Sequence, residues 1–286
     1  MEIKKVGVVG CGTMGAGIAQ VSAQSGYEVV VLENNEALLK KGISSIDSFL
    51  TKGVEKGKVS QQDKDSALAR IKGTIEYKDF YDCDLAIEAV NENMGLKEEI
   101  FAELDKVCPD HAILASNTSS LSIIDMASIT NRPEKVLGVH FMNPVPLMKL
   151  LEIVKSIATS DEVLETCKEF GKSLGKTVIV AKDTPGFIVN YLQYPFRLNA
   201  IRMLETNMAT KEDIDAAAKL ALGHPMGPLE LQDLVGLDVT YNGALATYEA
   251  TKDPRFAPPV LMQKMIAAGW LGRKTGKGFY EYNKKK

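Results

Sequence analysis

The sequence predicts an α/β fold in which a doubly wound, mostly parallel sheet precedes an all-α C-terminal domain. A short apolar strand at residues 6–9 runs straight into Gly10, Gly12 and Gly15. Strand and helix patterns then alternate, which favours parallel strands joined by right-handed crossovers. From Pro185 onward only helical patterns remain. This arrangement is Rossmann-like, and we expect two domains, residues 1–184 and residues 185–286.

Length and composition describe a globular chain of about two domains. Of 286 residues, 45% are hydrophobic and 25% charged, which is enough apolar material for sizeable cores. The net charge of −3 argues against a dedicated nucleic-acid or membrane-surface protein. The sequence contains no run of ~18 apolar residues, so we expect no transmembrane helix. The first strand begins too early for a signal peptide, so we expect a cytoplasmic protein.

The four cysteines are scattered and form no Cys-x-x-Cys pair. This favours reduced, structural thiols over metal ligands or disulfides, and we expect no metal site. Cys11 lies inside the glycine-rich turn. We interpret it as a small side chain in a tight turn, with a reactive thiol as the alternative.

The glycine-rich turn has the form Gly-x-Gly-x-x-Gly and opens a helix at Thr13 and Met14. Gly10 permits the tight turn, Gly12 allows close approach of a pyrophosphate, and Gly15 lets the helix pack on the strand. The helix N-terminus offers N–H groups and a positive dipole end to phosphates. A second strand at 27–32 ends at Glu33, about where an acid holds a ribose 2′-hydroxyl. An ordinary turn is the alternative, but the full order of features favours a dinucleotide site.

The remaining elements follow from apolar patterning, and Pro185 suits the first turn of the first C-terminal helix. Polar clusters at Glu92, 116–120 and 140–143 follow strands, so we expect them to converge beyond the carboxyl ends of the sheet. The pattern predicts strands at 84–90, 112–115, 135–139, 150–154 and 177–180, and helices at 36–71 (broken near Gly53 and Gly57), 96–107, from 121, 161–174, 186–205, 210–221, 227–236, 238–251 and 258–268.

His140 is the strongest candidate for acid–base chemistry, because it ends a strand on the side where the cofactor is expected. Glu152 interrupts an apolar strand, where a carboxylate needs a partner. A paired histidine and glutamate suit proton transfer near neutral pH. A structural ion pair is the alternative. His111 and His224 lie in turns, and we interpret both as structural.

The helical stretch after Glu33 is rich in lysine, including Lys52, Lys56 and Lys58. Such a run is usually a solvated helix face. The sharper alternative is a cationic ridge for a phosphorylated arm of a substrate.

Several motifs together resemble those of the L-3-hydroxyacyl-CoA dehydrogenases, closest to the short, single-function bacterial type. The resemblance spans essentially the whole chain, and the motifs occur in the family's order. They are the glycine-rich turn, Ser116-Asn117-Thr118-Ser119-Ser120, His140-Phe141-Met142-Asn143-Pro144, the segment from Asp183 to Asn190, and Gly223-His224-Pro225-Met226-Gly227-Pro228.

The resemblance implies a role for each candidate residue. His140 is the catalytic acid–base and Glu152 orients it, while Ser119 and Asn190 hold the 3-oxygen and thioester region of the substrate. Lys52 and Lys56 contact the coenzyme A arm. The helical domain closes the cleft and forms a homodimer or higher homo-oligomer. Cofactor contacts come from Gly10, Gly12, Thr13, Met14, Gly15, Glu33, Glu92, Lys97, Asn117, Asn143 and Lys274.

The implied activity is hydride transfer between NAD and an acyl-CoA pair, (S)-3-hydroxybutyryl-CoA and acetoacetyl-CoA, in butyrate or butanol fermentation or fatty-acid metabolism. Glu33 favours NAD over NADP, although Asn34 and Asn35 leave NADP open. One rival is a related Rossmann-type dehydrogenase with a lysine base, but no comparable lysine ends a strand here. Another is a dinucleotide-binding protein without turnover.

Overall fold

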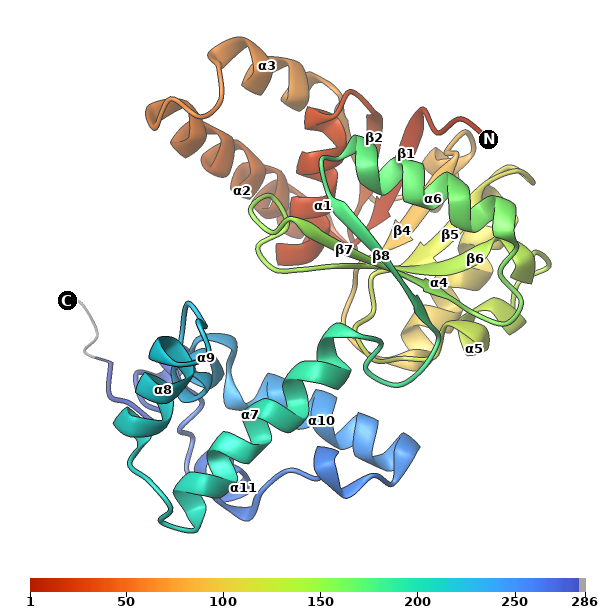
Figure 1. The fold of residues 1–286 in the computed structure, drawn as a ribbon. Helices are drawn as coiled ribbons and strands as arrows, with labels where there is room; N and C mark the ends of the chain where they lie inside the picture. The colour runs from red at the N-terminus through yellow and green to blue at the C-terminus, as the bar shows by residue number, and fades with distance from the viewer. Residues whose placement is uncertain (283–286) are drawn as a thin grey trace. The chain divides into compact units, whose positions relative to one another are not determined.

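The computed structural model describes residues 1–282. The chain divides into two compact units, Met1–Thr184 and Pro185–Lys286. The first unit contains an eight-stranded sheet with helices on both faces, and the second is helical (Figure 1). This confirms the predicted fold class. No helix among residues 1–282 is both long and apolar enough to cross a membrane.

The sheet has the strand order β3-β2-β1-β4-β5-β6-β7-β8. All neighbouring strands pair in parallel except β6 and β7, which are antiparallel. The strand order reverses between β1 and β4, the kind of switch point beside which open α/β sheets bind ligands. The strands are β1 (Lys5–Val9), β2 (Glu28–Leu32), β3 (Ile71–Thr74), β4 (Leu85–Glu88), β5 (Ile113–Ser116), β6 (Val136–Phe141), β7 (Leu150–Lys155) and β8 (Thr177–Lys182).

Most helices of the first unit begin at a polar residue whose side chain caps the first turn. Asn35, Ser60 and Asn93 each accept a backbone N–H of the helix that follows, which satisfies a donor that the helix itself cannot bond. The helices are α1 (Thr13–Gln24), α2 (Glu36–Glu55), α3 (Gln61–Ala69), α4 (Met94–Val107), α5 (Ile123–Ser128) and α6 (Asp161–Ser173), with short 3₁₀ turns η1 (Tyr77–Phe80) and η2 (Pro133–Lys135).

The main core of the first unit lies between the central strands and the helices that cover them. Val6, Val8 and Ile87 of the sheet are fully buried against Ile18 of α1, and Phe170 of α6 joins the same cluster. Apolar runs in the central strands are buried on both faces, as parallel strands require. This packing fixes the carboxyl ends of the strands, where His140, Ser119 and the glycine-rich turn lie.

Two sequence predictions in the first unit were wrong in detail. The helix expected to reach residue 71 ends at Ala69, and Ile71–Thr74 forms edge strand β3 beside β2. Its Ile-Lys-Gly-Thr sequence is too short and polar to resemble a strand. Gly53 does not break α2, where it lies close to Val59; the chain turns at Gly57, whose φ is +66°.

The second unit packs its helices around Leu198, Ile201, Leu229, Leu237 and Met262. The first of these helices starts later than predicted, because Pro185 and Gly186 lie in a turn that precedes it, with a φ of +81° at Gly186. Pro185 is therefore not a first-turn residue. The helices are α7 (Val189–Glu205), α8 (Lys211–Leu220), α9 (Pro228–Val235), α10 (Leu237–Thr251) and α11 (Val260–Ala267), with 3₁₀ turns η3 (Pro254–Phe256) and η4 (Arg273–Thr275).

Candidate active site

The glycine-rich turn between β1 and α1 has the geometry that a pyrophosphate requires. Gly10 has a φ of +95°, and a Cβ on Gly15 would lie 1.8 Å from the Gly10 carbonyl oxygen, so neither position accepts a side chain. A Cβ on Gly12 would meet nothing within 4 Å, which leaves the backbone open on that side. No side chain caps α1 at Gly12, so the N–H groups of its first turn, at Thr13 and Met14, point toward any bound anion.

Glu33 is held against this turn at the carboxyl end of β2. Its Oε2 accepts the Cys11 N–H at 2.9 Å, and its Oε1 accepts the Asn34 N–H at 2.8 Å. A carboxylate has further lone pairs, so these bonds still allow it to accept ribose hydroxyls. The residues therefore fit a dinucleotide, with the acid fixed beside the loop.

Cys11 is a packed side chain of this turn. It is buried, and a Cβ on Gly42 of α2 would lie 2.2 Å from its Sγ. Burial, with a contribution from the Glu33 charge, raises the pKa of the Cys11 thiol to about 11. The thiolate is therefore scarce at neutral pH, which supports the structural interpretation.

His140 and Glu152 face each other across the antiparallel pair of β6 and β7. They are register partners, and Nδ1 of His140 lies 2.8 Å from Oε2 of Glu152. Glu152 is fully buried and His140 is 7% exposed. A carboxylate on Nδ1 fixes the ring orientation and the tautomer. The pair lies near the carboxyl end of β6, on the same edge of the sheet as the glycine-rich turn.

A closed ring of hydrogen bonds and ion pairs, formed by five side chains and one backbone N–H, links the ends of β4 and β5. Glu88 accepts Lys97 Nζ and Ser116 Oγ, each at 2.6 Å, and both Glu88 and Lys97 are fully buried. Lys97 Nζ also lies 3.4 Å from Glu92. Glu92 accepts Thr118 Oγ1 at 2.9 Å, and the Thr118 N–H donates to Ser116 Oγ at 3.1 Å. The ring fixes the 116–120 loop.

Two predicted residues lie in this loop and are held there by hydrogen bonds. Glu92 accepts both the N–H and the Oγ of Ser119, at 2.7 and 3.0 Å. Asn117 Oδ1 accepts the Phe141 N–H at 2.9 Å, next to His140 in the chain. The structure therefore brings Glu92, Asn117, Ser119 and His140 to neighbouring strand ends, with Lys97 of α4 bonded beside them.

Sequence reasoning missed Glu88, which joins the ring to the sheet. Its signal was present, because Glu88 interrupts an apolar strand just as Glu152 does. It also missed Lys176, a buried lysine whose Nζ donates to the Val145 and Met148 carbonyls, each at 2.7 Å. These bonds hold the turn after the exposed Asn143. Burial lowers the pKa of Lys176. No sequence pattern identifies a buried lysine whose hydrogen bonds go to backbone carbonyls.

The remaining predicted residues belong to α2 or to the second unit. Lys52 and Lys56 are exposed near the end of α2, and the ion pairs formed within residues 1–282 include neither. In the second unit, Asn190 lies in the first turn of α7 and is 5% exposed. Lys274, in η4, pairs with Asp238 at 2.6 Å. His111 bonds Asp84, and His224 stacks on Phe196, both as structural histidines do.

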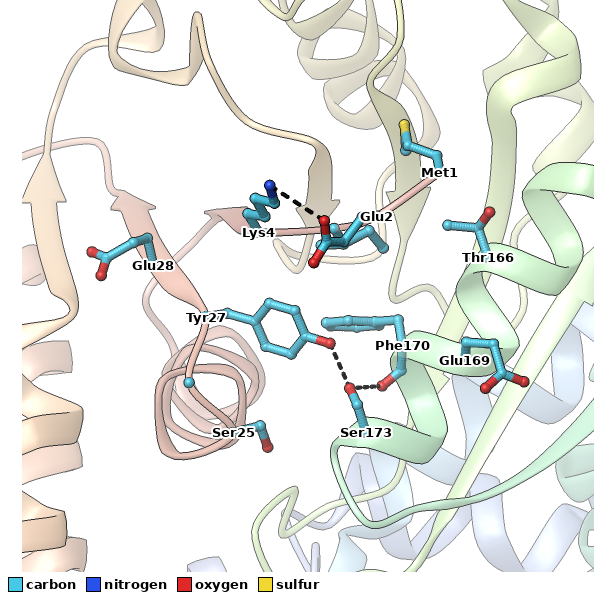
Figure 2. A pocket seen from close by; sticks show the side chains of 12 residues that line it. Met1, Glu2, Lys4, Ser25, Tyr27, Glu28, Thr166, Glu169, Phe170 and Ser173 are labelled. Carbon is cyan, nitrogen blue, oxygen red and sulfur yellow. Dashed lines mark hydrogen bonds and ion pairs between the residues drawn. The ribbon is translucent and has the colours of Figure 1, made fainter.

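A hollow of about 930 Å³ lies at the opposite, amino end of the sheet (Figure 2). Tyr27 and Phe170 pack edge to face on one side of it, and Tyr27 Oη lies 2.6 Å from Ser173 Oγ. No predicted site residue lines it. The hollow therefore lies at the edge of the sheet opposite to His140 and the glycine-rich turn.

Comparison with known proteins shows the family of the chain. The family model described as 3-hydroxyacyl-CoA dehydrogenase, NAD binding domain, matches residues 5–184, and the model of the C-terminal domain matches residues 186–282. The 3-hydroxybutyryl-CoA dehydrogenase of Mycobacterium tuberculosis is 48% identical over 98% of this chain and 99% of its own length. The mitochondrial hydroxyacyl-coenzyme A dehydrogenase of Sus scrofa is 44% identical over 98% of this chain and 91% of its own length.

A solved structure has the same fold throughout. The crystal structure of (S)-3-hydroxybutyryl-CoA dehydrogenase PaaH1 from Ralstonia eutropha matches with a TM-score of 0.96 and 43% identity, over 99% of this chain and 100% of that one. Fold, glycine-rich turn and family model together define an oxidoreductase that binds NAD. The chain belongs to the 3-hydroxyacyl-CoA dehydrogenase family. This sets aside both the lysine-base dehydrogenases and a dinucleotide-binding protein without turnover.

Proposed function

We propose that this enzyme interconverts (S)-3-hydroxybutyryl-CoA and acetoacetyl-CoA. The observation that carries the proposal is the buried contact of 2.8 Å between His140 Nδ1 and Glu152 Oε2 at the carboxyl edge of a dinucleotide-binding sheet. Relatives that match nearly the whole chain are named 3-hydroxybutyryl-CoA dehydrogenase, which supports the four-carbon acyl-CoA.

NAD supplies or accepts the hydride when bound; the chain's own residues handle the proton and the substrate. In reduction, His140 donates a proton from Nε2 to the 3-oxygen as negative charge develops there. In oxidation, His140 takes that proton back. Glu152 keeps the ring oriented and stabilises its protonated form. Ser119 and Asn190 contact substrate oxygens, and a hydrogen bond donated by Asn190 stabilises the developing charge. The Ser119 hydroxyl, which donates to Glu92 in this structure, has to turn to the substrate to do the same.

Different parts of the cofactor are held by different groups of the proposed contact residues. The loop from Gly10 to Gly15 holds the pyrophosphate, and Glu33 holds the adenosine ribose. The other proposed cofactor contacts are Glu92, Lys97, Asn117, Asn143 and Lys274. NADP is the alternative cofactor, tested below. Lys52 and Lys56 hold the phosphates of coenzyme A.

The experiment that tests this function is the oxidation of NADH by acetoacetyl-CoA, followed at about 340 nm, where the reduced nicotinamide absorbs. We expect turnover, with the (S)-3-hydroxy product. Tight NADH binding with no turnover on acetoacetyl-CoA would contradict the proposed substrate pair. Activity only on longer acyl chains would keep the family and change the substrate.

We also propose a cytoplasmic homodimer or higher oligomer that associates through residues 185–286 and serves butyrate or butanol fermentation or fatty-acid metabolism. Domain closure over the substrate is part of the same proposal. Sedimentation of the whole protein tests the oligomer: a monomer at micromolar concentration would contradict it.

A further inference from the structure

A chain of hydrogen-bonded side chains runs along α7 and ends at Asn190. Nη1 of Arg197 donates to Oε1 of Gln193 at 3.1 Å, and Nε2 of Gln193 donates to Oδ1 of Asn190 at 2.5 Å. The three residues are spaced three and four apart, so they share one face of the helix. The proposed function has the Asn190 amide contact the substrate. That amide is thus hydrogen-bonded to Gln193, a residue to which no role has been assigned.

Arg197 is anchored at its other end inside the helical unit. Nη2 donates to Oε1 of Gln232 on α9 at 2.6 Å and to Oγ1 of Thr240 on α10 at 2.5 Å. Arg197 is 3% exposed, and no carboxylate among residues 1–282 forms an ion pair with it. Burial lowers the pKa of Arg197 to about 10, so the guanidinium is still protonated at neutral pH.

This burial is costly, because the cation has only neutral partners. Arg197 Nε and Gln232 Nε2 are also buried without a hydrogen-bond partner among the described residues. An apolar side chain would fill the same place without these losses. Packing alone therefore gives no account of Arg197, and a role in the hydrogen-bonded chain does.

The order of donors and acceptors from Arg197 through Gln193 to Asn190 can run in only one direction. A guanidinium has donors and no acceptor, so the group of Gln193 that faces Arg197 must be its carbonyl oxygen. The NH₂ group of Gln193 is then the group that faces Asn190, and it requires the Asn190 carbonyl oxygen. The NH₂ group of Asn190, a donor, therefore points away from Gln193. An amide alone could turn either way.

We propose that Arg197 and Gln193 are positioning residues that set the Asn190 amide with its NH₂ group toward a carbonyl or alkoxide oxygen of the substrate. The inference rests on the proposed function. In this proposal Asn190 donates the hydrogen bond to the substrate. Gln193 and Arg197 determine that the NH₂ group of Asn190, and not its carbonyl oxygen, faces the substrate, without contacting the substrate themselves.

The test is Gln193→Glu. A carboxylate still accepts from Arg197, but it cannot donate to Asn190, so the Asn190 amide turns and presents its carbonyl oxygen to the substrate. Loss of one such donor lowers kcat by ~10²-fold or more. The unfolding midpoint should not fall, because the introduced carboxylate gives the buried cation a charged partner. The matched control is Gln263→Glu on the exposed face of α11, which should leave both quantities unchanged.

A double mutant separates orientation from a general effect on the fold. In an Asn190→Ala background the amide is gone, so Gln193→Glu should lower kcat no further, whereas a structural effect would add to the first loss. Additive losses would overturn the inference. If the wild type reduces acetoacetyl-CoA, and Asn190→Ala lowers kcat but Gln193→Glu does not, only the positioning role would be overturned. A wild type inactive on acetoacetyl-CoA would overturn the proposed function, and the inference with it.

Discussion

Glu88 and Lys97 form an ion pair of 2.6 Å in which both side chains are fully buried. Glu88 is the last residue of β4, and Lys97 lies in the first turn of α4. Glu88 also accepts the Val90 N–H and the Ser116 hydroxyl. Two strands and a helix are therefore held together beside the proposed cofactor contacts Glu92, Lys97 and Asn117.

Glu88→Gln should destabilise the enzyme, because it leaves a buried lysine without its nearest countercharge. Breaking such a pair costs about 3 kcal/mol or more. Glu92, 3.4 Å from Lys97 Nζ, offsets part of this loss. Denaturant unfolding measures the change in the free energy of unfolding.

The control for this prediction is Glu103→Gln. It breaks the exposed pair of Glu103 and Lys106 on the same helix, which has a similar distance of 2.7 Å. An exposed pair contributes about 0–1 kcal/mol. Equal shifts for the two variants would show that the buried pair adds no more than a surface pair.

The sequence was sufficient for the elements whose patterning is strong, and insufficient where position depends on neighbours. The apolar strands, the glycine-rich turn and the clusters after β4, β5 and β6 were predictable, because each has a local signature. Edge strand β3 was not, because Lys72 and Gly73 carry no apolar alternation and only β2 defines the strand.

Contacts within the candidate site show the same division. Register pairs His140 with Glu152, and residue types alone suggested that pair. The ring through Glu88 and Lys97 needs the order of strands β4 and β5. Arg197 resembles any helical arginine in sequence, and only the packing of α7, α9 and α10 buries it.

The proposed role of Lys52 and Lys56 can be tested by comparing a substrate that has the nucleotide end of coenzyme A with one that lacks it. Lys52 and Lys56 are exposed, so replacing both with alanine should leave the fold intact. If they bind the phosphates of coenzyme A, KM for acetoacetyl-CoA should rise about tenfold, since two charge-assisted contacts are lost. KM for a truncated thioester without the nucleotide should hardly change.

The control is Lys40→Ala with Lys41→Ala, two exposed lysines earlier on the same helix. This pair should leave KM for both substrates unchanged. An equal rise in KM for the full and the truncated thioester in the Lys52 and Lys56 variant would show that these lysines serve the fold.

We expect Glu33 to determine the choice between NADH and NADPH. A 2′-phosphate would meet a like charge at Glu33, and the bonds from the Cys11 and Asn34 N–H groups hold that carboxylate in place. We therefore expect kcat/KM to be higher with NADH than with NADPH. Glu33→Ser should narrow the ratio by raising activity with NADPH relative to NADH. A wild-type preference for NADPH would contradict this assignment.

The acid–base pair gives the most direct test of the chemistry. His140→Gln should lower kcat by the ~10²–10⁴-fold typical of a lost general acid–base. NADH binding, measured by fluorescence, should survive, because the glycine-rich turn is untouched. Glu152→Gln should lower kcat as well, because the contact of 2.8 Å that orients His140 loses its charge.

The double variant tells whether His140 and Glu152 act as one unit. Residues that act as a unit are not additive, so the double variant should be little slower than the slower single variant. Multiplied losses, or near-full activity of His140→Gln, would show that the histidine is structural and that the proton comes from another group. Steady-state kcat with acetoacetyl-CoA at saturating NADH distinguishes these outcomes, since a loss at the proton-transfer step lowers it directly.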